Sequence, residues 1–157
     1  KSIVFPRNQF GPQHIEICKK HGITRFRGTP TSWAYRSTKG DGQSRLRRAL
    51  RLIDAYSGVL GSQAYRLADR DNGDVPASRF LRPCSGRFRA AHPLHLWVIK
   101  REMTRAAKAG QVYHLWWHPH NFGRDTDANI GGLESVLRHY DLLKQRYGFK
   151  SLTMGDC

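Results

Sequence analysis

The chain has 157 residues, a formal net charge of +15 and 39% hydrophobic residues, which suits one domain over residues 1–157 with its own core. No apolar stretch approaches the roughly 20 residues of a membrane-spanning helix, and no signal-peptide pattern is present. The three cysteines are widely spaced, which disfavours a disulfide framework and leaves the compartment open, with a reducing one such as the cytoplasm favoured.

The basic charge balance has two interpretations. It can mark a polyanionic partner, such as nucleic acid or an acidic polysaccharide. Alternatively, the arginines simply face solvent, as charged residues ordinarily do. Several arginines fall on the outer faces of predicted helices: Arg47, Arg48, Arg51 and Arg138. Because the sequence contains no dense basic run and no recognised nucleic-acid motif, nucleic acid is disfavoured as a partner.

The first half of the chain alternates predicted strands and helices. Residues 3–5 predict a strand, and residues 12–22 predict a helix that begins at a proline and stops at a glycine. Residues 23–26 predict a second strand. Residues 44–57 predict a helix that begins at an N-cap serine. Its apolar residues are expected to face inward: Leu46, Ala49, Leu50, Ile53 and Tyr56.

A polar loop over residues 61–76 separates the two halves of the chain. Residues 80–81 then predict a short strand, and residues 93–110 predict a helix between a proline and a glycine. The side chains expected on the buried side of this helix are Leu94, Trp97, Val98 and Met103.

The last elements continue the alternation. Residues 112–117 are mostly apolar and aromatic, which predicts a buried strand, and Pro119 ends it near His118. The clearest helix follows and stops at Gly148, and residues 150–153 predict a final strand. The apolar stripe of that helix consists of Leu133, Val136, Leu137, Tyr140 and Leu143.

This alternation predicts an α/β fold with parallel strands. About five strands are too few for a complete eight-stranded (β/α) barrel, which typically needs about 250 residues, so an open sheet or part of a barrel is expected. In both folds the carboxyl ends of the strands meet at one edge, where active sites lie. Polar residues follow the predicted strands at positions 6–9, 27–28, 82–83, 118–121 and 153–156.

The stretch around His118 supports three hypotheses. Since the ordinary pKa of histidine is about 6.5, His118 can act as a general acid or base. Alternatively, His118 and His120 are metal ligands of another metallo-hydrolase. A histidine can also be structural, which fits mid-strand His114 best. Trp116 and Trp117 either fill the core or offer a flat face to a sugar ring.

Short segments at the predicted strand ends carry a family resemblance. They are Phe5-Pro6-Arg7-Asn8-Gln9, Phe26-Arg27-Gly28, Leu115-Trp116-Trp117-His118, His118-Pro119-His120-Asn121-Phe122 and Ser151-Leu152-Thr153-Met154-Gly155. They resemble polysaccharide deacetylases of the NodB-homology type, and the third matches the L-x-x-H motif of that family. The resemblance implies a partial (β/α) barrel that lacks its N-terminal strands. It also implies an enzyme that removes N-acetyl groups from amino sugars in a polysaccharide or oligosaccharide.

The resemblance also implies roles for individual residues. In the family, a metal-bound water attacks the acetamide carbonyl with the help of an aspartate base, and a histidine protonates the departing amine. His118 resembles that histidine, and Leu115 resembles the residue that lines the acetyl-methyl pocket. Arg7 is the first candidate for the arginine that holds the aspartate, and Arg27 is the alternative. Residues 6–9 depart from the usual R-P-P-Y pattern of the family.

The remaining expectations concern substrate, metal and partners. The residues expected to contact substrate are Trp33, Trp117, His120, Asn121 and Arg27. The ligands of a divalent metal such as zinc are expected upstream of Lys1, because no H-x-x-x-H motif occurs at a matching position. The chain alone is therefore expected to be inactive and to need a missing N-terminal segment or a partner chain. A basic module that binds anionic glycan or nucleic acid is the alternative function.

Overall fold

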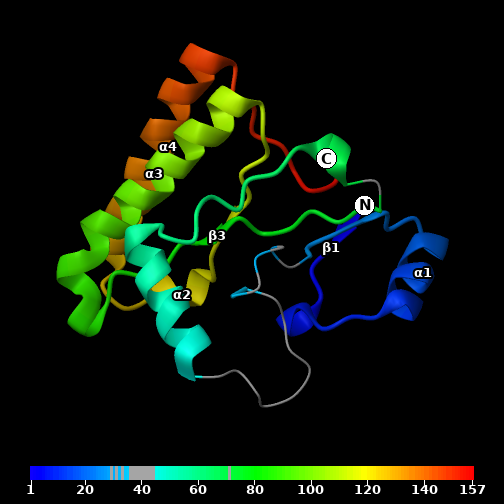
Figure 1. Ribbon diagram of the computed structural model, residues 1–157, viewed down its shortest axis with the longest axis horizontal. Coiled ribbons are helices and arrows are strands. Elements are labelled where there is room, and N and C mark those ends of the chain that lie inside the picture. Colours follow the sequence, from blue (N-terminus) through cyan, green and yellow to red (C-terminus); the bar gives the residue numbers. More distant parts are fainter. Residues whose placement is uncertain (29, 31, 33, 36–44, 71) are drawn as a thin grey trace.

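The computed structural model describes residues 1–28, 30, 32, 34–35, 45–70 and 72–157, and only the backbone of Arg7 and Arg87 (Figure 1). The helices are α1 (Pro12–Lys20), α2 (Arg45–Ser57), α3 (His92–Ala109) and α4 (Thr126–Tyr147). The strands are β1 (Ser2–Ile3), β2 (Arg25–Phe26), β3 (Arg79–Phe80) and β4 (Leu115–Trp116). Short 3₁₀ helices cover Pro6–Asn8, Leu67–Asp69, Gly86–Ala91 and Pro119–Phe122.

The strands are parallel, as the sequence predicts, but the expected partial (β/α) barrel is wrong. β1 pairs with β2 and β3 pairs with β4, each over two residues. A single parallel bridge between Phe26 and Asp74 lies between the two pairs. Residues 150–153 form no strand. Because the ladders are so short, the described residues form two small sheets among longer helices rather than a continuous curved wall.

The predicted helices are confirmed, because their ends carry strong local signals. α3 ends before Gly110 and α4 ends before Gly148, and both glycines have a positive φ, 61° and 64°. Glycine adopts this left-handed conformation without a steric penalty, so it ends a helix cleanly. α4 begins at Thr126, ahead of the apolar stripe that predicts it.

The predicted inward face of α2 is wrong. Leu46 and Ile53 are 65% and 55% exposed, whereas Asp54 and Ala55 are buried. The helix turns this face inward because the Asp54 carboxylate accepts hydrogen bonds from the Tyr35 hydroxyl (2.6 Å) and the Leu60 N–H (2.8 Å). A buried carboxylate that is fully bonded therefore sets the rotation of the helix. Three other apolar side chains expected to be buried are also exposed: Leu94, Trp97 and Leu137.

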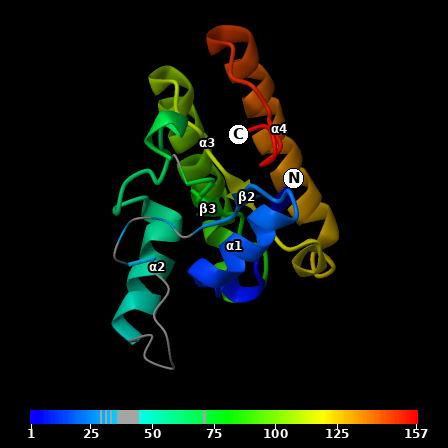
Figure 2. The same ribbon diagram turned by 90° about the vertical axis from the view of Figure 1, so that its right-hand side faces the viewer.

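The main core lies between α3 and α4. Six buried residues form it: Leu81, Ile99, Met103, Phe122, Val136 and Leu143. A second, aromatic cluster joins the N-terminal elements, where the Phe10 ring lies 4.9 Å from Phe5 and 5.1 Å from Phe26. Figure 1 shows α2, α3 and α4 gathered on one side of the strands and α1 on the other, and in the view of Figure 2 α1 lies in front, with α2 to its left and α4 to its right.

Candidate active site at the strand ends

Side chains from the ends of β2, β3 and β4 meet around the Trp116 ring. The Arg27 guanidinium carbon lies 4.5 Å from the centre of this ring, and the Phe80 ring lies 4.5 Å from it. The His118 ring packs edge-on against Trp116 at 5.1 Å, and His120 stacks on His118 at 5.1 Å. Cation–π and edge-to-face contacts of this kind hold rings at defined angles. We call these five residues the strand-end site.

The end of β1 is joined to the same site through Asn8. Its side-chain oxygen accepts two hydrogen bonds from the Arg27 guanidinium (3.2 and 3.1 Å), and its amide donates to the Gly28 carbonyl (3.4 Å). Gly28 fits here because a Cβ would lie 1.7 Å from a carboxylate oxygen of Asp74. Asp74 itself pairs with Arg70. In the described ranges Arg27 has no carboxylate within 4.0 Å, and burial lowers its pKa.

His118 is exposed and stands directly before the 3₁₀ helix Pro119–Phe122. Its carbonyl accepts a hydrogen bond from the Asn121 N–H (3.0 Å), which closes that turn. Among the described residues, neither nitrogen of its ring is engaged in a hydrogen bond, and ring packing alone holds the imidazole. The arrangement leaves the ring nitrogens accessible to an approaching molecule, as proton transfer requires.

The stacking of His118 and His120 argues against a shared metal ion. The two ring planes lie 23° apart with centroids 5.1 Å from each other. Imidazole lone pairs lie in the ring plane, and a bound ion sits about 2 Å from the nitrogen. Two nearly parallel planes at this separation do not meet at such a point. Within the described part of the chain, no three His, Cys, Asp or Glu side chains group as a metal site.

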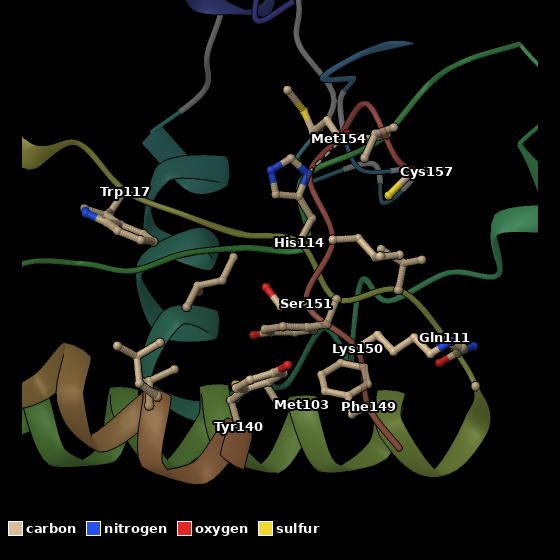
Figure 3. A pocket seen from close by; sticks show the side chains of 18 of the residues that line it. Met103, Gln111, His114, Trp117, Tyr140, Phe149, Lys150, Ser151, Met154 and Cys157 are labelled. Atoms are coloured by element: carbon tan, nitrogen blue, oxygen red, sulfur yellow. Dashed lines mark hydrogen bonds between the residues drawn. The ribbon is translucent and has the colours of Figure 1, made fainter. Parts of the chain in front are cut away.

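The other expected site residues lie in different places. Leu115 and Trp117 line an apolar cavity of about 560 Å³ between β4 and the helices α3 and α4, which does not include His118 in its lining (Figure 3). His114 also lines this cavity, and its ring Nδ1–H donates to the Val75 carbonyl (3.3 Å), a structural role. Trp33 and the side chain of Arg7 lie outside the described residues.

A second cavity, of about 300 Å³, adjoins the strand-end site. Phe80 and Trp116 are aromatic residues of its lining, which also includes Arg48, Arg51 and Arg82. Arg48 and Arg51 belong to α2 at a spacing of three residues, which places them on one helix face. Arg82 follows β3. We call this space the arginine cavity.

A buried ionic cluster behind this cavity escaped the sequence analysis. The Arg79 guanidinium donates two hydrogen bonds to the Glu102 carboxylate (2.7 and 2.6 Å) and lies 3.2 Å from Asp54. The Tyr113 hydroxyl donates to Glu102 (3.1 Å). All three charged side chains are at most 6% exposed. The sequence contains no clear signal for it, since Glu102 directly follows Lys100 and Arg101 and does not stand out as a buried charge.

His95 connects α3 to α2 and to the backbone of Arg82, which lines the arginine cavity. Its Nδ1–H donates to the Ala55 carbonyl (2.7 Å), and its Nε2 accepts from the Arg82 N–H (3.0 Å). Both bonds require the neutral imidazole, because protonated Nε2 would meet another donor. Burial lowers the pKa of His95 to about 4. The ring is therefore neutral, and its hydrogen bond with the Arg82 N–H holds the backbone in place at that residue.

A comparison of the chain with family models, curated proteins and solved structures finds no match. None of the helices in the described ranges has the length and apolarity that crossing a membrane would require.

Proposed function

We propose that this chain supplies the proton donor of a hydrolase that removes N-acetyl groups from amino sugars in a polysaccharide. The observation that carries the proposal is the position of His118. This histidine is exposed beside Trp116 and Phe80, at an edge that also receives Arg27 from the neighbouring strand pair. The resemblance of residues 115–118 to the L-x-x-H deacetylase motif gives the same residue the same role.

The chemical task of His118 follows from the leaving group. Amide hydrolysis adds water to the carbonyl carbon and then breaks the C–N bond. The amine is a poor leaving group unless its nitrogen gains a proton as the bond breaks. An imidazolium beside the scissile bond donates that proton, and the products are acetate and the free amino sugar. The flat ring of Trp116 beside it suits the apolar face of a sugar.

The resemblance also implies a divalent metal that activates the water, together with an aspartate base. The described residues do not group the ligands for such an ion, so they do not fit it, and no step is assigned to it. Under this proposal the metal and the base come from polypeptide outside the present sequence. The 157-residue chain incubated with zinc is therefore expected to release no acetate from N-acetylglucosamine oligomers. Robust turnover by this chain alone would refute the proposal that other polypeptide supplies the metal and the base.

The decisive experiment replaces His118 with Gln in the complete, metal-loaded protein. We expect the rate of acetate release from an N-acetylated amino-sugar oligomer to fall by about 10²–10⁴-fold. Hydrolysis of an aryl acetate should fall far less, because a phenolate leaves without a proton. His21→Gln, at an exposed histidine beyond the end of α1, is the control and should leave both rates unchanged. An equal loss with both substrates would contradict the proton-donor role.

A further inference from the structure

Two arginines that line the arginine cavity carry positive charge that no carboxylate of the described residues neutralises. Arg79 at its rear is already paired with Glu102 and Asp54. By contrast, Arg48 and Arg82 have no carboxylate within 4.0 Å in the described part of the chain. Arginine presents a planar fork of donors that matches carboxylate and phosphate oxygens. Cations gathered around a concave space are suited to an oxyanion.

The wall of the cavity indicates what carries that oxyanion. Phe80 and Trp116 line it with aromatic rings, and the same two rings pack against His118 at 5.9 and 5.1 Å. A volume of about 300 Å³ lies at the lower end of the range for small-molecule sites, which suits one sugar residue better than an extended polymer. A cavity lined by both aromatic rings and cations therefore fits a sugar ring that bears a negative group.

We propose that the arginine cavity binds a sugar residue carrying a carboxylate or phosphate, so that the substrate polymer is acidic. This inference rests on the proposed function, because the cavity adjoins the proton donor through Trp116. A bound acidic residue would place the same sugar, or its neighbour in the polymer, beside His118. Arg48 and Arg82 would contact the oxyanion, and Trp116 would contact the ring.

Binding can be tested without catalysis. Isothermal titration of the 157-residue chain would use glucuronic acid, glucose 6-phosphate, neutral glucose, inorganic phosphate and a short oligothymidylate as probes. We expect at least one of the two acidic sugars to bind at least tenfold more tightly than glucose. The comparison of glucuronic acid with glucose 6-phosphate identifies the source of the negative charge, and a preference for either one supports the proposal.

Variants distinguish binding in the arginine cavity from a general attraction between the basic protein and an acidic sugar. Arg48→Gln and Arg82→Gln should each weaken acidic-sugar binding at least tenfold. Arg105→Gln removes the same charge from an exposed position on α3 and should leave binding unchanged. Arg48 is exposed on α2, so its variant is expected to fold even if the Arg82 variant does not. His118→Gln should also keep full binding of the acidic sugar. The binding test can therefore succeed or fail independently of the proposed proton-donor role of His118.

Four results would overturn the inference. They are equal binding of neutral and acidic sugars, equal losses in the Arg48 and Arg105 variants, inorganic phosphate that binds as tightly as the sugars, and tighter binding of the oligothymidylate. The third would indicate a simple anion site, and the last would indicate a nucleic-acid surface.

Discussion

The side chain of Arg79 is the centre of the buried charge in this protein. It forms a two-bond pair with Glu102 and a further contact with Asp54, and all three side chains are excluded from water. Removing one partner of such a pair leaves a buried charge without compensation, which costs far more than losing an exposed pair. The cluster joins β3 to α2 and α3, so its loss would loosen the wall behind the arginine cavity.

Arg79→Gln therefore tests the cluster, because it leaves the buried carboxylates of Glu102 and Asp54 without their cation. We expect it to lower the free energy of unfolding by about 3–5 kcal/mol, measured by urea denaturation. The matched control is Arg138→Gln, which breaks an exposed pair with Glu134 within α4 and should cost at most about 1 kcal/mol. Losses of equal size would show that the Arg79 cluster contributes no more than a surface ion pair.

The neutral His95 ring predicts a pH dependence of stability. Burial lowers its pKa to about 4, against about 6.5 in the unfolded chain. Between these values the unfolded state binds the proton and the folded state does not, so stability falls as the pH falls from about 6.5 to about 4. The full effect is about 3 kcal/mol. Chemical denaturation of wild type and His95→Gln at several pH values should show a shallower slope in the variant. Parallel curves would show that His95 does not cause the slope and that other titratable groups do.

At the residue scale, strand ends were more predictable than buried charges. The expectation is that polar strand ends meet at one edge of a single sheet; Asn8, Arg27 and His118 do lie near one another, but they follow strands of two separate sheets. The expectation fails for residues 153–156, because no strand precedes them. Arg79, Asp54 and Glu102 could not be paired from sequence, since hydrogen bonds between distant segments leave no periodic signal. The apolar pattern of α2 even indicated the wrong buried face.

At the scale of elements, the helices were predictable and the sheet was not. Helices are specified locally by caps and by a stripe at a period of 3.6 residues. The strands pair over only two residues each, and such short ladders are decided by tertiary contacts. Residues 150–153 show this plainly, because they read as a strand yet run beside the apolar cavity without pairing.

Two adjacent glycines in α4 test the packing of α4 against α3. A Cβ at Gly131 would meet open space, whereas a Cβ at Gly132 would lie 2.9 Å from the ring of buried His92 and 3.5 Å from Leu96. Alanine in a helix interior is favoured over glycine by about 0.5–1 kcal/mol. Gly131→Ala should therefore raise the free energy of unfolding by about that amount, and Gly132→Ala should lower it. Thermal denaturation of both variants measures the difference. A gain in both would mean that the helices have room to separate.

At the scale of the whole molecule, the net charge of +15 opposes compaction. Raising NaCl from 0.01 to 0.15 M shortens the screening length from about 30 to about 8 Å, which weakens repulsion between distant surface charges. The buried Arg79 pairs are shielded from salt, and the exposed pairs contribute little. We therefore expect the melting temperature at pH 7 to rise with NaCl, by about 2–4 °C for each kcal/mol of repulsion relieved. The rise should persist in Arg48→Gln, since it belongs to the whole surface and not to an anion held in the arginine cavity. A melting temperature that falls with salt would show instead that attractive surface pairs dominate the charge balance.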